Sequence, residues 1–106
     1  MENTSGQGDD SAVPKEIDNW NWGAVFLSLI WGIGNKTYVA FFVLVPIINI
    51  FVLIALGYNG NKWAWRNKKW ESIEHFKQVQ KRWTYAGYVT FAIYIFLFIR
   101  GLYSLL

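Results

Sequence analysis

The sequence contains no cysteine and a single histidine among 106 residues, and both shortages limit its chemistry. Without cysteine there can be neither a disulfide framework nor a thiolate metal site. His75 alone provides no ligand cluster for zinc or another transition metal. No nucleophile motif, dinucleotide fingerprint or phosphate-binding loop is present either. We therefore predict a protein without catalytic residues, cofactor or metal, and hence not an enzyme.

Charge is also scarce, because charged residues make up 16% of the chain against 54% hydrophobic and 20% aromatic residues. The apolar residues are gathered in blocks, which is typical of membrane proteins. The charges are distributed unevenly: residues 1–19 carry five acids and one base, whereas residues 58–83 carry seven of the ten Lys and Arg residues. The length allows one structural unit.

The first two segments are predicted to lie outside the bilayer core. Residues 1–19 have too few apolar side chains to offset the entropy of ordering, which predicts a disordered acidic tail. They lack the charged and apolar regions of a cleavable signal peptide. In residues 20–36 the apolar core would form a helix only about 18 Å long, too short for a hydrocarbon layer of about 30 Å. We expect an interfacial or re-entrant helix there, the alternative being the start of the first span.

Residues 37–57 are predicted to form the first transmembrane helix. Thr37 to Leu56 is a run of 20 residues without a charge, or about 30 Å of helix. Pro46 is expected to kink this helix. Asn49 is then an intramembrane polar group, available to bond a neighbouring helix of the hairpin or a partner.

Residues 84–106 are predicted to form the second transmembrane helix. Arg100 would lie about 25 Å along this helix from Trp83, near the far interface, where its side chain can reach the headgroups. We therefore interpret Arg100 as an interface anchor.

The connecting segment, residues 58–83, is basic, rich in tryptophan and amphipathic. Asn59-Gly60-Asn61 has turn chemistry, and Asn61 is predicted to cap a helix that starts at Lys62. Aromatic residues recur at helical spacing and the bases lie among them. We predict that this segment contacts a partner or lipid headgroups through Trp63, Trp65, Trp70, Phe76, Trp83, Lys68, Lys69, Lys77, Lys81 and Arg82.

Together these segments predict an all-α membrane protein with two transmembrane helices in a hairpin. A short interfacial or re-entrant helix precedes the hairpin, and a basic amphipathic helical segment joins its spans. Lys and Arg in short loops stay in the cytoplasm, so residues 58–83 should be cytoplasmic and both termini outside. In the competing arrangement residues 22–33 form a third span and return the N-terminus to the cytoplasm. Bases interleaved with tryptophan can also bind nucleic acid, but tethering to the bilayer at both ends argues against it.

Three separated stretches carry a resemblance to a known family. They are Asn21-Trp22-Gly23-Ala24, then Trp31-Gly32-x-Gly34-Asn35, and then a longer pattern that runs from Gly60-Asn61-x-Trp63-Ala64-Trp65 through Asn67-Lys68-x-Trp70 to Gln80-x-x-Trp83. Over residues 19 to 88 the chain resembles a family of small, Trp-rich bacterial integral membrane proteins of unknown function. The resemblance implies a multi-pass protein of the bacterial cytoplasmic membrane and brings no functional residue with it.

The leading functional hypothesis is a non-enzymatic accessory or interaction subunit of a bacterial membrane complex. Two spans bury little against each other, so we expect another membrane protein or self-association, together with anionic lipid headgroups, as partners. One alternative is an oligomeric channel or transporter component, which the absence of a mid-membrane charge weakens. Another alternative is an immunity or membrane-stress protein.

Overall fold

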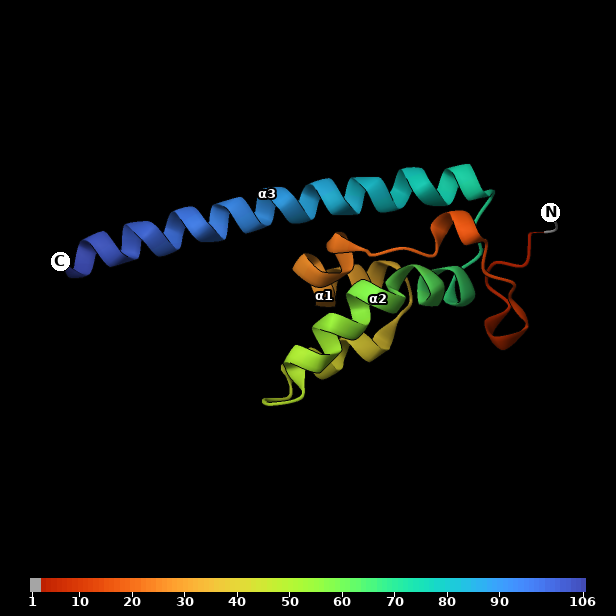
Figure 1. Ribbon diagram of the computed structural model, residues 1–106, viewed down its shortest axis with the longest axis horizontal. Helices are drawn as coiled ribbons and strands as arrows, with labels where there is room; N and C mark the ends of the chain where they lie inside the picture. Colours follow the sequence, from red (N-terminus) through yellow and green to blue (C-terminus); the bar gives the residue numbers. More distant parts are fainter. Residues whose placement is uncertain (1–2) are drawn as a thin grey trace.

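The computed structural model describes residues 3–106, and this part of the chain is helical without any strand (Figure 1). The predicted all-α fold class is therefore confirmed. Two single-turn 3-10 helices, η1 and η2, come first, and a longer 3-10 helix, η3, separates the first two α-helices. The elements are η1 (Gly8–Asp10), η2 (Lys15–Ile17), α1 (Trp22–Gly34), η3 (Tyr38–Leu44), α2 (Asn49–Asn67) and α3 (Ile73–Leu105).

A small aromatic core holds a polar body together. This body consists of α1, the C-terminal half of α2, the N-terminal half of α3 and the N-terminal segment. Trp65 and Trp70 both pack edge-on against Phe76, with ring centroids 5.6 and 4.7 Å apart. The Trp70 indole N–H donates to the Ala64 carbonyl at 2.9 Å, so its polar atom is satisfied inside the core.

The N-terminal segment, expected to be disordered, packs on this body from Asn3 onward. The Ser5 hydroxyl accepts a hydrogen bond from the Trp70 N–H at 2.7 Å, and the Gly6 N–H donates to the Trp65 carbonyl at 2.8 Å. Ile17 is buried in the core. The segment is ordered because backbone groups around the break between α2 and α3 have no partner within a helix. The Ser5 hydroxyl and the Gly6 N–H bond these groups.

Small residues let α1 lie close to α3. Gly23 faces the backbone of Trp83 and Thr84, and Gly87 faces the side chain of Phe26. The Asn21 side chain caps α1 by accepting from the Ala24 N–H at 3.0 Å. One side of α1 is thus buried within the body, while Ile30 on another side of the helix is exposed.

Helix α2 runs without a break through Asn59-Gly60-Asn61, so the turn predicted there is wrong. Asn61 lies inside α2 and caps nothing, because its side chain is buried and hydrogen-bonded to other segments. The helix ends at Asn67 instead. Helix α3 then starts at Ile73, where the Ser72 hydroxyl accepts from the His75 N–H at 3.0 Å.

The predicted first transmembrane helix is also wrong, because residues 37–57 do not form one helix. The chain runs along η3, turns at Val45 to Ile48 and returns along α2 (Figure 1). Pro46 has no N–H to continue a helix, and it keeps Val45 in an extended conformation with ψ of 118°. The expected kink is therefore a reversal of the chain.

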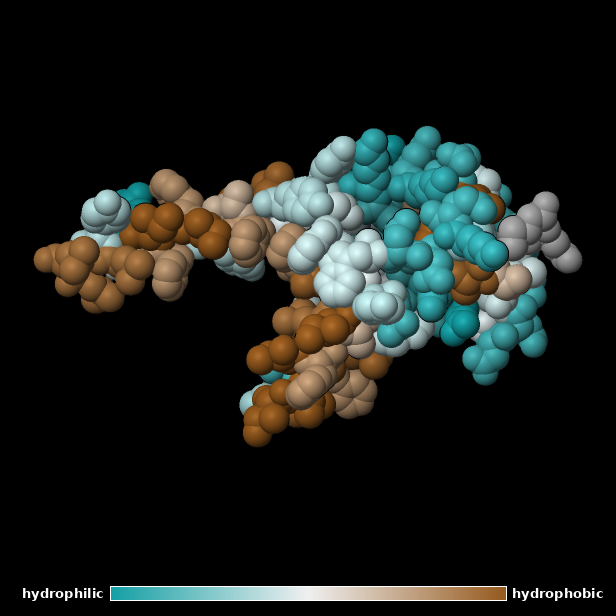
Figure 2. Space-filling view, in the orientation of Figure 1, coloured by the Kyte–Doolittle hydropathy of each residue, from teal (hydrophilic) through white to brown (hydrophobic). Residues whose placement is uncertain are grey.

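Of the described residues, only α3 forms a helix that is long and apolar enough to cross a membrane. The two-span hairpin is thus reduced to one candidate span. Helix α3 joins the predicted basic helix and the predicted second span into 33 residues, or about 50 Å. Figure 2 shows two hydrophobic lobes that leave the hydrophilic body: the C-terminal half of α3, and η3 with the start of α2.

Candidate functional site

Four buried amide side chains and one indole form a hydrogen-bonded network at the centre of the body. Gln80 Oε1 accepts from Asn21 Nδ2 and from Trp31 Nε1, both at 2.9 Å. Gln80 Nε2 donates to Asn35 Oδ1 at 2.8 Å. Asn21 Nδ2 also donates to Asn61 Oδ1 at 2.7 Å. The network therefore links α3 to both ends of α1 and to the middle of α2.

These amides position helices and are not free to bind a ligand. Asn21 Nδ2 uses both of its protons, and Gln80 Oε1 uses both of its lone pairs. Asn61 Nδ2 donates to the Asn19 side chain at 2.8 Å, which ties the segment before α1 to α2. A fully satisfied buried polar network of this kind rigidifies a unique packing arrangement.

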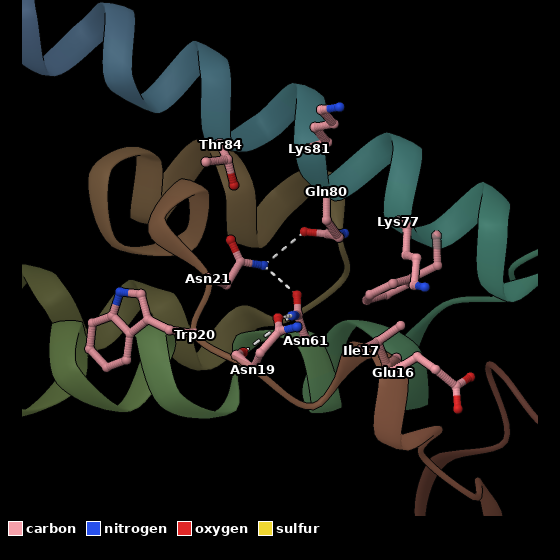
Figure 3. Close-up of a pocket in the computed structure, with 11 residues that line it drawn as sticks. Glu16, Ile17, Asn19, Trp20, Asn21, Asn61, Lys77, Gln80, Lys81 and Thr84 are labelled. Atoms are coloured by element: carbon pink, nitrogen blue, oxygen red, sulfur yellow. Dashed lines mark hydrogen bonds between the residues drawn. The ribbon is translucent and has the colours of Figure 1, made fainter.

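A cavity of about 230 Å³ opens beside the network, between the segment before α1 and the underside of α3 (Figure 3). Trp20 and Thr84 line one end and Glu16 the other. Lys77 and Lys81 lie along its α3 side, and both are exposed. The cavity thus presents amines, a hydroxyl and a carboxylate at the surface.

Aromatic side chains lie where the polar body meets the two apolar lobes. Trp20 contacts Tyr58 of α2, with ring centroids 6.2 Å apart, and Trp22 at 5.4 Å. Phe26 of α1 lies 6.1 Å from the ring of Tyr88 on α3. Tyr58 and Tyr88 lie at the boundary between the polar and the apolar half of α2 and of α3. Tryptophan and tyrosine prefer this level at a membrane surface.

Three aromatic residues predicted to contact a partner lie instead in the core. Trp65, Trp70 and Phe76 are each 1% exposed, so they cannot form a docking surface. Trp63 and Trp83 are half-buried. The helical periodicity was wrong in predicting one helix through these residues, because Trp65 belongs to α2, Trp70 lies in the break that follows and Phe76 belongs to α3. The three side chains meet because α2 and α3 fold together around them.

The predicted basic residues are at the surface. Lys69, Lys77, Lys81 and Arg82 are exposed, and Lys68 is half-buried with its amine 3.2 Å from the Gly34 carbonyl. Lys81 lies over the ring of Tyr85, 5.7 Å from its centroid. Four of the five predicted bases are therefore exposed.

The predicted intramembrane residue Asn49 and the predicted interface anchor Arg100 lie toward the ends of the two apolar lobes. Asn49 is the first residue of α2, beside the turn, and is half-buried. Within residues 3–106 its side chain makes no hydrogen bond. Arg100 is exposed near the end of α3.

The sequence interpretation missed the structural role of the amide network. The residues were visible as isolated Asn and Gln side chains that accompany glycine and tryptophan in the three stretches quoted above. Only the contacts between helices distant in sequence give these residues a role. Residue pairs in the network are separated by 40 to 59 positions, for example Asn21 with Asn61 and with Gln80.

A scan of protein-family models, a search of curated proteins and a search of solved structures each give no match.

Proposed function

We propose that this protein is a non-enzymatic integral membrane protein, an accessory or interaction subunit of a complex in a bacterial cytoplasmic membrane. It holds a rigid basic body at the membrane surface on a single crossing helix. We include in this proposal that the protein is related to the small, Trp-rich bacterial membrane proteins that its sequence resembles. The partner, another membrane protein or a second copy, contacts the apolar surface of α3.

The observation that carries this proposal is the exposure of α3. In its apolar 18-residue window no residue is buried within the chain. A contiguous apolar surface of that size requires a membrane or a protein to cover it. A helix that crosses a bilayer alone presents all its faces to lipid or to neighbouring helices. The large aromatic side chains of the body are buried in its core, so α3 offers the larger surface for a partner.

Charge on the body supports the same arrangement. Lys69, Lys77, Lys81 and Arg82 lie on the polar side of the aromatic boundary described above. Each base near an anionic leaflet contributes about 1 kcal/mol. The body is thereby held against headgroups while α3 remains available for contacts within the bilayer.

A photo-crosslinking scan of α3 in native membranes tests the proposal. A photoreactive residue is placed at each position from Tyr88 to Tyr103 in turn, and the adducts are separated by mass. A partner helix predicts one protein adduct, confined to positions that repeat every three to four residues along one stripe of α3. Exposed Lys69 on the body is the matched control position, where that adduct should not form.

Other results would contradict the proposal. Crosslinks to lipid alone at every position, together with a monodisperse monomer after mild extraction, would overturn the accessory role. Ion flux through the purified protein in liposomes would favour a channel or transporter component in its place.

A further inference from the structure

The second apolar lobe is a helical hairpin made of residues 38–56. The sequence has no charged residue between Lys36 and Lys62. Most of the hairpin's large side chains are exposed, and Ile47 at the turn is the most exposed of them at 84%. In Figure 2 the hairpin forms a hydrophobic projection separate from the one formed by α3. The sequence block interpreted as a span therefore projects from the body and returns to it.

Hydrogen bonds join the residues just before this hairpin to the end of α2 on the body. Asn67 Nδ2, at the end of α2, donates to the Thr37 hydroxyl at 3.1 Å. Next to it, Lys68 Nζ donates to the Gly34 carbonyl at 3.2 Å. The chain thus leaves the body at Thr37 and is back beside Thr37 at Asn67, so the two ends cannot lie on opposite sides of a bilayer.

The length of the returning arm of the hairpin matches one leaflet. The returning part of α2, from Asn49 to Gly57, is about 13 Å long. Half of a hydrocarbon core of about 30 Å is about 15 Å. The turn therefore reaches the middle of the bilayer when the aromatic boundary lies at its surface.

The chemistry of the turn fits hydrocarbon and not water. Ile47 has φ of 75°, where a turn in water would use Gly, Asn or Asp. Pro46 brings no N–H group, and the N–H groups of Val45 and Asn49 donate to the carbonyls of Phe42 and Val45. Two of the four N–H groups from Val45 to Asn49 are thus bonded within the hairpin, which lowers the cost of placing this turn in a bilayer.

We propose that residues 38–56 form a re-entrant hairpin in the acyl-chain region of the leaflet on the body side, while α3 crosses both leaflets. The occupant of the exposed hairpin surface is lipid. This inference concerns a membrane-binding element separate from the partner contact on α3, so either proposal can fail without the other.

Single cysteines provide a direct test, because the natural chain has none to interfere. The variants Lys36→Cys and Lys69→Cys place labels at exposed positions before the hairpin and after the end of α2. Ser104→Cys places a label at the far end of α3. Each is treated with a membrane-impermeant maleimide in intact spheroplasts and in inverted vesicles. We expect positions 36 and 69 to react in the same preparation and position 104 in the other.

Reaction of positions 36 and 69 from opposite sides would overturn the proposal and restore a full span. Depth is tested on Ile47→Cys carrying a fluorescent label, in bilayers whose acyl chains are brominated near the midplane. We expect several-fold stronger quenching than for a label at Lys69→Cys. Equal, weak quenching at both positions would show that water or protein covers the hairpin, and would also overturn the proposal.

Discussion

At the scale of single residues, Gln80 joins three other buried side chains. It bonds Asn21, Trp31 and Asn35 at once. Replacing it with Ala leaves the Trp31 indole N–H, the Asn35 Oδ1 atom and one proton of Asn21 Nδ2 without this partner, and each buried unsatisfied group costs about 1 to 3 kcal/mol. We expect Gln80→Ala to lower the free energy of unfolding by about 3 kcal/mol or more.

Thermal unfolding in a mild detergent, followed by circular dichroism, measures this loss. Gln78→Ala is the matched control, because Gln78 is exposed two positions away on the same helix and should change stability by less than about 0.5 kcal/mol. Equal melting temperatures for the two variants would show that the network does not hold the helices together.

Residue patterns in the sequence identified structurally important positions more reliably than they identified the role of each position. The spacing of Trp70 and Phe76 predicted one helix face, but Trp70 lies in the break between α2 and α3 and only Phe76 is in a helix. A face directed at a core and a face directed at a partner also have the same periodicity. For Asn61 the local turn preference was misleading, because a buried bond to Asn21 outweighs it. Local sequence does not contain the long-range contact that decides either case.

At the scale of elements, the contact between α1 and α3 depends on Gly23. A Cβ there would lie 2.8 Å from the Trp83 carbonyl carbon and 2.9 Å from the Thr84 nitrogen, both backbone atoms that cannot rotate away. We expect Gly23→Ala to destabilise the protein by about 1 to 3 kcal/mol through overpacking. The same unfolding measurement reports the loss.

Gly101→Ala is the control for this substitution. A Cβ at Gly101 meets nothing within 4 Å, and alanine favours a helix by up to about 1 kcal/mol over glycine. This variant should therefore be neutral or slightly more stable. A loss of stability as large as that of Gly23→Ala would mean that the close approach of α1 and α3 does not explain the effect at Gly23.

Hydropathy alone located both apolar elements but could not give their shapes. Residues 37–57 and 84–106 are both apolar blocks of about the length that a bilayer requires. Pro46 indicated a break in the helix, but a proline is found both at helix kinks and at chain reversals. The choice between them depends on the bonds from Asn67 and Lys68 back to the start of the hairpin.

At the scale of the whole molecule, the arrangement of charge predicts an orientation. Nine of the ten Lys and Arg residues precede the apolar part of α3, and Arg100 alone lies beyond it. Bases in short segments remain in the cytoplasm. The packed N-terminal segment must lie on the same side as the body, contrary to the expectation that both termini are outside. We therefore expect a cytoplasmic N-terminus and an external C-terminus.

Reporter fusions measure this orientation. Alkaline phosphatase, which is active only outside the cytoplasm, should be active when fused after Leu106 and inactive when fused before Met1. The reverse pattern, or activity at both ends, would show that the charge distribution does not set the topology.

The re-entrant hairpin also gives the protein a wedge-shaped cross-section within the bilayer. The body-side leaflet must make room for η3, the start of α2 and α3 together, whereas the opposite leaflet accommodates α3 alone. Lipids on one side are spread apart more than those on the other, and this mismatch is relieved where the body-side leaflet bends outward. The protein should therefore accumulate at curved regions of a membrane, and at high density it should itself promote bending.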